Sequence, residues 1–354
     1  LTHRKNTNLG NAPQVCYRHS FYLTARDFLP QQRMFEVMAD NALHQIIMTR
    51  QREQWTAFEQ TAREAGKPFP PDSDGAKALG AAFAYSAFVA ANCIRHPHMA
   101  LDLIDSHDLF EEKSFDCLAQ SLSMRLNEIK KGAVSDPLER LMLPLKSELR
   151  SFRRREMVRI AVRDLAGVAG LNDTMADLSA LASVSIDAAL DLLYAYCCAK
   201  YGTPVDQNGD PQRLVVLGMG KLGAGELNFS SDVDLIFTFP SGGETYGGKS
   251  SIANVDFFTR LCRHLIQAIG DNTADGFVFR VDTRLRPFGD SGPLAMSFDH
   301  MEDYYQLQGR EWERYALIKA NVVAGDRDAG QSLLGRLKPF IYRRFLDFGV
   351  FESL

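Results

Sequence analysis

The sequence lacks the features that mark several broad classes of protein. It carries 40 Lys and Arg against 44 Asp and Glu, and the net charge of −4 gives no reason to expect nucleic acid or an anionic membrane as a partner. No apolar run approaches the ~20 residues that a membrane span requires, and no signal peptide is visible. We therefore expect a cytoplasmic protein outside any membrane.

Cysteine spacings typical of metal sites are also missing. None of the six cysteines belongs to a Cys-x-x-Cys pair, so their spacing favours neither a zinc site nor a disulfide framework. We expect free thiols in a reducing compartment. The chain has no initial Met and stops abruptly after Phe-Glu-Ser-Leu at 351–354, which leads us to expect a piece of a longer protein.

The chain changes character near residue 200. Before that point apolar residues recur at helical spacing, and after it short apolar runs alternate with helical patterns. We predict an α+β protein, in which an all-helical N-terminal domain precedes a domain with a small mixed sheet flanked by helices. The predicted divisions are a loose lead-in at 1–30, a helical domain at 31–200, the sheet-containing domain at 201–340 and the start of a truncated helical segment at 341–354.

Individual elements follow from the same patterns. Pro97 and Pro144 are expected at helix boundaries, because proline disrupts a helix interior. The expected helices include Met175–Tyr201, Asn254–Ile269 and a stretch at about 298–322. The expected strands are Leu214–Leu217, Val233–Phe239 and Phe277–Leu285.

One predicted helix, Leu145–Leu165, is rich in arginine. Six arginines surround its apolar stripe: Arg150, Arg153, Arg154, Arg155, Arg159 and Arg163. The pattern allows two interpretations, a solvated helix face or a positive wall beside a phosphate site.

Two carboxylates, Asp232 and Asp234, stand one residue apart at the start of a predicted strand. Side chains alternate across a strand, so both point the same way. Neighbouring carboxylates repel each other and are costly to bury unless a cation lies between them. Mg²⁺ prefers hard oxygen ligands, and two such ions can hold the attacking and leaving oxygens of a displacement at phosphorus. The pattern predicts a divalent-metal site for phosphoryl chemistry.

A third carboxylate stands in the alternating stretch at 277–287. There Asp282 shares the polar face with Arg280, Arg284 and Arg286. Asp282 is either a third metal ligand or a structural acid paired with Arg280 or Arg284. In the first case the forked donors of the arginines suit bidentate contacts to substrate phosphates.

The glycines before the acidic strand admit two functions. Gly218, Gly220 and Gly223 spell G-x-G-x-x-G after an apolar run, which is the dinucleotide-binding fingerprint of a nicotinamide-dependent oxidoreductase. That fold requires a helix running on from the third glycine. Gly225 and the polar residues after it leave little room for such a helix before Asp232.

The other interpretation is a turn that faces a phosphate. Backbone N–H groups around Gly220 would meet the phosphate oxygens. The hydroxyls of Ser230 and Ser231 would add donors, and Lys221 would add positive charge.

A Gly-rich turn, then Ser-Asp-x-Asp on a strand, then a distant acid on another strand resembles the polymerase-β type of nucleotidyltransferase. The usual turn of that superfamily has Gly-Ser where this chain has Gly220-Lys221. Three longer stretches resemble the glutamine synthetase adenylyltransferase family: GMGKLGAGELNFSSDVDLIF, DGFVFRVDTRLRPFGDSGPL and DYYQLQGREWERYALIKA. This resemblance covers about residues 80–354. The sequence NFSSD, which follows a long helical segment, resembles the N-terminal, deadenylylating half of the family.

The resemblance implies a function and a site. Members of the family are bifunctional: one domain adds AMP to a tyrosine of glutamine synthetase, and the other removes it by phosphorolysis. Carried over to this sequence, the family pattern makes Asp232, Asp234 and Asp282 the ligands of two Mg²⁺ ions. The same pattern places Gly220, Lys221, Ser230 and Ser231 along the phosphates, with Arg284, Arg286 and Lys319 as further contacts.

Substrates and partners follow from the same resemblance. Phosphate and ADP or ATP are the expected small substrates and products, and glutamine synthetase is the expected protein partner. A PII-type signal protein and glutamine are the expected regulators. Two alternatives stay open: adenylylation with ATP, and a docking module for the PII-type protein with weak catalysis.

Overall fold

The computed structural model describes residues 42–66, 70–132 and 137–342. The chain divides into two compact units, Leu1–Arg50 and Gln51–Leu354. Helix α2 (Ala42–Glu64) contains the described part of the first unit. The predicted lead-in at 1–30 and nearly all of the predicted segment at 341–354 lie outside the described residues. The larger unit holds both helices and sheet, and the domain divisions within it stay predictions.

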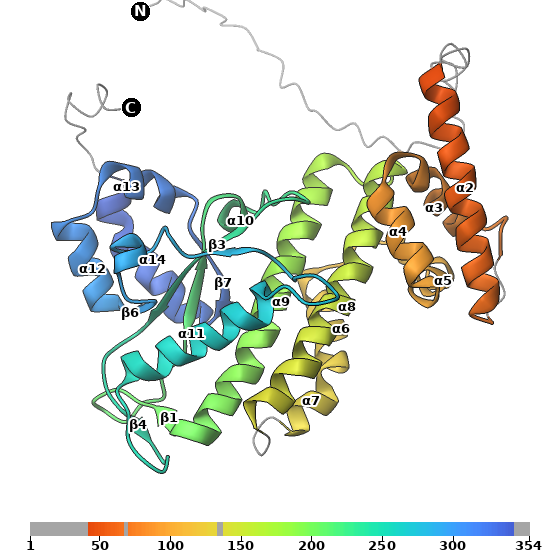
Figure 1. The fold of residues 1–354 in the computed structure, drawn as a ribbon. Helices are drawn as coiled ribbons and strands as arrows, with labels where there is room; N and C mark the ends of the chain where they lie inside the picture. Colours follow the sequence, from red (N-terminus) through yellow and green to blue (C-terminus); the bar gives the residue numbers. More distant parts are fainter. Residues whose placement is uncertain (1–41, 67–69, 133–136, 343–354) are drawn as a thin grey trace, which may run out of the picture. The chain divides into compact units, whose positions relative to one another are not determined.

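The N-terminal half of the larger unit is helical, as predicted (Figure 1). Three of its helices begin at serines whose side chains accept a hydrogen bond from the N–H three residues on, which explains where these helices start. The helices are α3 (Asp74–Tyr85), α4 (Ala87–Arg95), α5 (Pro97–Asp105), α6 (Phe115–Arg125), α7 (Asn127–Gly132), α8 (Leu138–Leu165) and α9 (Leu171–Tyr201).

The two prolines expected at helix boundaries behave differently. Pro97 is the first residue of α5, where the missing N–H would have no helical partner in any case. Pro144 lies inside α8, so the expected boundary there is wrong. Leu141 and Leu145 on either side of it are buried, and their burial in the core favours a continuous helix despite the lost hydrogen bond.

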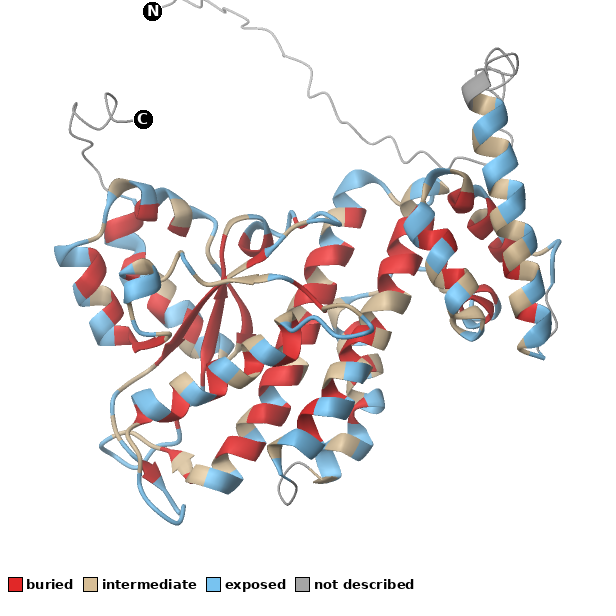
Figure 2. Cartoon of the chain, viewed as in Figure 1, coloured by how far each residue is buried: buried red, intermediate tan, exposed pale blue. Residues whose placement is uncertain are grey.

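Helix α9 is the central helix of this unit. It packs against α6, α8, α11 and β7, and its buried residues follow its whole length (Figure 2). Among the described residues it is the one helix long and apolar enough to cross a membrane, judged by length and composition. However, 61% of its most apolar window is buried inside the protein. A core helix with neighbours on several sides has this composition.

The sheet is small and mixed, as predicted. Its order is β5-β3-β2-β7, and β6 also pairs with β3. Strand β2 runs antiparallel to β3 and β7, whereas β5 and β6 run parallel to β3. The strands are β2 (Val215–Gly218), β3 (Val233–Phe239), β5 (Val281–Asp282), β6 (Ala295–Ser297) and β7 (Asn321–Gly325). A separate pair consists of β1 (Thr203–Pro204) and β4 (Thr245–Tyr246).

Helices cover both faces of this sheet (Figure 1). Leu235 and Phe237 pack into the core that includes α9 and α11 (Asn254–Gly270). Leu217 and Ile236 pack into the core on the other face. That face is covered by α12 (Phe298–Leu307), α13 (Glu311–Ile318) and α14 (Arg327–Ile341). Because both faces are buried, β2 is apolar without alternation, and in β3 only Asp234 and Thr238 interrupt the apolar run.

Two predicted elements are wrong in extent. The strand expected over Phe277–Leu285 is reduced to Val281–Asp282. The reason is that β5 pairs with the start of β3, while β6 pairs with its end. The helical stretch expected at about 298–322 is two helices followed by β7. The apolar run of β7, Val322–Ala324, is too short to be assigned to strand or helix by periodicity alone.

The arginine-rich helix differs from both interpretations of its sequence. Arg150, Arg159 and Arg163 are at most 5% exposed, so the solvated-face interpretation is wrong for them. The Arg159 guanidinium donates to Asp177 at 3.0 Å and also pairs with Glu156 at 2.6 Å. These carboxylates occupy the guanidinium, so the phosphate-wall interpretation is wrong for Arg159 as well.

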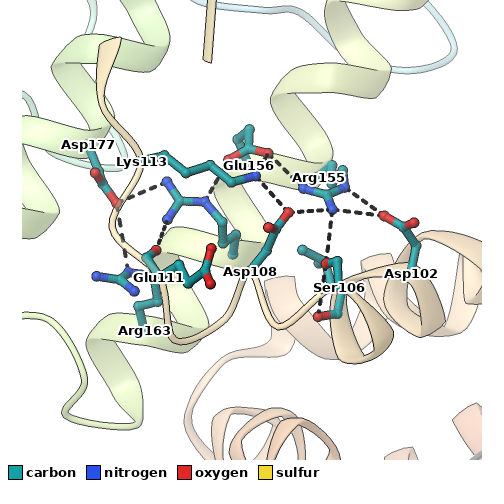
Figure 3. Close-up of polar contacts among 11 residues, drawn as sticks. Asp102, Ser106, Asp108, Glu111, Lys113, Arg155, Glu156, Arg163 and Asp177 are labelled. Atoms are coloured by element: carbon teal, nitrogen blue, oxygen red, sulfur yellow. Dashed lines mark hydrogen bonds and ion pairs between the residues drawn. The ribbon is translucent and has the colours of Figure 1, made fainter. Parts of the chain in front are cut away.

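The network continues across the helices around α8 (Figure 3). Arg155 donates to Asp102 at 2.8 Å and to Asp108 at 2.7 Å, and it also reaches Glu156 at 2.8 Å. Lys113 pairs with Asp108 at 2.6 Å. Burial alone would raise the pKa of the Glu156 carboxyl, but the surrounding cations lower it. The charges of α8 therefore join helices to one another inside the protein.

Candidate active site

The centre of the candidate site is a pair of carboxylates on adjacent strands. Asp234 of β3 is the register partner of Asp282 of β5, and the two strands run parallel. Register partners in a sheet point to the same face, so the two side chains project together. Asp232 lies two residues before Asp234, and its side chain is 49% exposed. The fold thus gathers the three acids that the sequence singled out.

The two central acids differ in their electrostatics. Partial burial raises the pKa of Asp234, and repulsion from Asp282 and Asp232 raises it further. Hydrogen bonds from Arg284 lower the pKa of Asp282 instead. Asp234 therefore carries a negative charge that Arg284 compensates less than it compensates Asp282. A cation at this point would relieve it.

Each outer carboxylate contacts an arginine. Arg280 pairs with Asp232 and donates to the Ser230 carbonyl oxygen at 2.7 Å. The Arg284 side chain donates to Asp282 at 2.9 Å, and its backbone N–H donates to the same carboxylate at 2.8 Å. The structural pairing considered for Asp282 is thus present. Within the described residues no group of three or more His, Cys, Asp or Glu side chains is arranged to hold a metal ion.

The chemistry of the donor set nevertheless fits a divalent cation. Three carboxylates supply the hard oxygen ligands that Mg²⁺ prefers. Asp234 has the raised pKa of an acid whose negative charge lacks compensation. Arg284 is 74% exposed in its side chain, so it can leave Asp282 without opening the core. The residues present are therefore able to hold the metal if the arginines move away.

The glycine turn lies directly against the acidic strand. The Met219 N–H donates to the Asp234 carbonyl oxygen at 2.9 Å. Gly220 has a φ of +54°, and a Cβ there would lie 3.4 Å from the Asp234 carboxylate. The next residue, Lys221, has an exposed side chain, and its ammonium group forms no hydrogen bond or ion pair with the described part of the chain. This turn therefore places its backbone and the exposed Lys221 side chain near the acids.

The dinucleotide interpretation of the glycines is wrong. Helix α10 (Gly220–Ala224) has only five residues, and the strand after it returns antiparallel to β2. A dinucleotide fold needs a long helix and a parallel strand there. Gly223 is explained by packing instead: a Cβ would lie 2.0 Å from the Lys319 carbonyl oxygen and 2.3 Å from that of Gly218.

The other predicted site residues are held by their own surroundings. The Ser231 hydroxyl donates to Asn228 at 2.6 Å, and the Ser230 hydroxyl donates to the same acceptor at 3.4 Å. Both serines therefore order the turn before Asp232. Lys319 is the C-cap residue of α13 and pairs with Glu226 at 2.6 Å.

Arg286 also has its donors occupied. It donates to the Thr283 carbonyl oxygen at 2.8 Å and to the Asp290 carbonyl oxygen at 3.2 Å, and its side chain is 11% exposed. In this arrangement Arg286 braces the loop after β5. Arg280, considered as a partner of Asp282, pairs with Asp232 instead. Glu226 was missed as a site residue, because its contact with Lys319 arises only in the tertiary fold.

The helical half holds the segment that leads into β5. Arg150 of α8 is 2% exposed and donates to the carbonyl oxygens of Gly276 at 2.6 Å and Ala268 at 3.1 Å, and also to that of Asp271. Further ion pairs at 2.6 Å join Lys146 to Asp271 and Arg154 to Asp275. This segment connects α11 to the strand with Asp282, so α8 contributes to the position of that acid.

The fold and site define an α+β protein in which a helical half precedes a small mixed sheet with three neighbouring carboxylates. A family model described as glutamate-ammonia ligase adenylyltransferase matches residues 76–336, well over half of the chain. The chain belongs to this family.

Curated relatives agree with the family match. Each of three bears the name bifunctional glutamine synthetase adenylyltransferase/adenylyl-removing enzyme. The protein of Nitrosococcus oceani is 51% identical over 78% of this chain, and that of Pseudomonas aeruginosa is 52% identical over 77%. The protein of Shewanella loihica is 44% identical over 90% of it. The chain spans between 27% and 32% of the length of these relatives.

Proposed function

We propose that this chain carries out nucleotidyl transfer on glutamine synthetase, and specifically that it removes AMP from an adenylylated tyrosine by phosphorolysis. The observation that carries the proposal is the register pairing of Asp234 with Asp282, beside Asp232 and the Gly220 turn. Family membership and the names of the relatives support the class of reaction.

Asp232, Asp234 and Asp282 would hold two Mg²⁺ ions. Such ions supply charge neutralisation on the phosphoryl oxygens of an in-line displacement. The protein's own contribution is to keep the three carboxylates on one face of adjacent strands. The raised pKa of Asp234 reflects partial burial and the proximity of the other two acids. The three acids are therefore close together without a cation, while Arg280 and Arg284 contact the two outer ones.

Cationic and backbone groups would orient the phosphates. Arg284 has an exposed side chain next to Asp282, from which its forked donors can reach a phosphate. Lys221 is exposed beside Asp234 on the turn at Gly220. The hydroxyls of Ser230 and Ser231 are close enough in sequence to Asp232 to serve as further donors once they leave Asn228.

The bond changes are simple. An oxygen of inorganic phosphate attacks the phosphorus of the adenylyl group, and the bond between that phosphorus and the tyrosine oxygen breaks. The products are ADP and tyrosine. The leaving group is a phenolate with a pKa of about 10, which leaves without a strong general acid and then takes a proton from water.

The direction of transfer rests on sequence. NFSSD at 228–232 resembles the deadenylylating half of the family. The relatives' names include both activities, and adenylylation with ATP uses the same kind of carboxylate site. We also propose a cytoplasmic location, with a PII-type protein and glutamine as regulators. A pull-down with the PII-type protein tests the docking alternative.

One experiment tests the reaction and its direction. The chain is incubated with adenylylated glutamine synthetase, Mg²⁺ and phosphate. Formation of ADP supports phosphorolysis, whereas AMP would indicate hydrolysis. If neither forms, a parallel incubation with unmodified glutamine synthetase and ATP tests the forward transfer. Asp232→Asn should abolish turnover in a folded protein, and Asp299→Asn, at another exposed acid, is the matched control. Normal turnover by the Asp232 variant would refute the proposed site.

A further inference from the structure

A groove runs along one face of α8 beside the candidate site. It is a cavity of about 360 Å³, and its floor includes Arg153, Met157 and Ala161. These residues are four apart and therefore lie along one side of the helix. The floor is about 12 Å long at 1.5 Å per residue. Phe88 of α4 and Phe229 contribute to the walls.

No carboxylate in the described part of the chain pairs with Arg153. Its Nε is buried and has no hydrogen-bond partner there, and its guanidinium lies over the rings of Phe277 and Phe279. Burial, together with repulsion from Arg154 and Arg150, lowers the pKa of Arg153 to about 10. A partly buried cation in this condition is costly unless an anion pairs with it. The other α8 arginines near it are paired with carboxylates or carbonyls of the protein itself.

The rim of the groove is aromatic and exposed. Tyr85 is 54% exposed, Phe88 40% and Phe229 38%. A single exposed apolar residue is ordinary, whereas several around one cavity indicate a binding surface. Asp164 also lines the groove, eleven residues along α8 from Arg153, and it accepts a hydrogen bond from the Thr174 hydroxyl at 3.1 Å. The groove thus offers apolar contact, with the positive charge of Arg153 at one end of its α8 floor and a carboxylate at the other.

Phe229 connects this groove to the acids. It immediately precedes Ser230 and lies three residues before Asp232. Three residues span at most about 10 Å. A polypeptide in the groove would therefore lie within reach of the carboxylates, where the substrate tyrosine must be placed.

We propose that this groove binds the polypeptide segment that flanks the modified tyrosine of the protein substrate. An acidic side chain of that segment pairs with Arg153. Apolar side chains of the segment contact the aromatic rings of Tyr85, Phe88 and Phe229. The proposal rests on the proposed function, because it assigns the groove to the same protein substrate.

Direct binding tests the groove. The affinity of the whole chain for adenylylated glutamine synthetase is measured for wild type, Arg153→Met and Phe88→Ala. We expect binding at least about tenfold weaker in both variants, since each removes a central contact. Phe110→Ala is the matched control, because Phe110 is 42% exposed and lies outside the groove. Melting curves establish that the variants fold, and if Arg153→Met does not, Phe88→Ala decides. Wild-type affinity in the folded groove variants would overturn the proposal.

A small substrate separates this proposal from the proposed function. Adenylyl-tyrosine amide contains the scissile bond but no flanking polypeptide. If the function is correct, wild type forms ADP from this amide, and the groove variants do so at the wild-type rate. Slower turnover of the amide by folded groove variants would overturn the docking role. If wild type forms no ADP from either substrate, the proposed function fails, while the binding measurement still decides the groove.

Discussion

Asp234 and Asp282 are register partners on parallel strands, although a long helix separates them in the sequence. Their carboxylates share one face of the sheet, and their pKa values shift in opposite directions. Arg284 compensates Asp282, whereas nothing compensates Asp234 to the same degree. Because of this asymmetry, mutations at the two positions should have different effects on stability.

Asp234→Asn and Asp282→Asn should differ in their effect on stability, and only the second should lower it. The folded-state pKa of Asp234 is raised, so its negative charge destabilises the fold as pH rises through that pKa. Removing that charge should leave the Tm at pH 7 unchanged or higher. The folded-state pKa of Asp282 is lowered, so its charge stabilises the fold above the ordinary Asp pKa, and this variant should melt lower.

The same two variants test the metal. Both should bind Mn²⁺, a probe for Mg²⁺, at least about tenfold more weakly, because each loses a carboxylate ligand. Electron paramagnetic resonance of free Mn²⁺ measures this without any turnover. Wild-type affinity in both folded variants would exclude the two acids as ligands.

Glu156→Gln should destabilise the protein by about 3–5 kcal/mol, because it leaves buried Arg159 with less compensation. The folded-state pKa of Glu156 is lowered, so its contribution is present above the ordinary Glu pKa and is lost as pH falls through the lowered value. Urea denaturation at pH 7 and below pH 4.5 measures the free energy of unfolding of both proteins. The difference in this free energy between variant and wild type should become smaller at the lower pH. An equal difference at both pH values would contradict this account.

Arg150→Met should loosen the segment before β5. The variant leaves the buried Ala268 carbonyl oxygen and the partly buried carbonyl oxygens of Gly276 and Asp271 without their donor, at a cost of about 1–3 kcal/mol. Hydrogen exchange measured by mass spectrometry should rise most at residues 268–280. Arg213→Met is the control, because Arg213 forms an exposed pair with Asp191 and should change stability by less than about 1 kcal/mol. Unchanged exchange in the Arg150 variant would show that α8 does not hold this segment.

Gly223→Ala should prevent normal folding or cost at least about 3 kcal/mol, because its Cβ would overlap two carbonyl oxygens. Gly335→Ala should instead stabilise by about 0.5–1 kcal/mol, because it lies in α14 with open space around it. Thermal melts of the two variants compare a glycine required by close packing with a glycine in an open helix position. Similar melting temperatures would contradict the packing explanation for Gly223.

Local patterns predicted much of the fold. Val233–Phe239 was predicted with its observed bounds, and α11 was predicted to within one residue. Both elements have a strong apolar pattern that packing reinforces. β5 and β7 were misjudged, because a short strand depends on which neighbour pairs with it. Pro144 was misjudged because the burial of its neighbours outweighs the lost helical hydrogen bond.

The sequence predicted which residues form the candidate site better than it predicted the contacts that their side chains make. Asp232, Asp234, Asp282 and the Gly220 turn come together as expected. The sequence did not reveal that Arg286 braces a loop or that Lys319 pairs with Glu226. Side-chain partners that are distant in sequence depend on how the elements pack, and periodicity carries no information about them.

By itself, the sequence determined which strand carries the acids and which turn precedes it, since alternation and glycine placement are local properties of the backbone. It also contained the motifs of the family. Only the tertiary structure decided that Asp282 stands beside Asp234, because parallel pairing brings together strands that are far apart along the chain. Packing likewise decided that the arginines of α8 are largely structural, since a buried cation must find its partners on neighbouring elements.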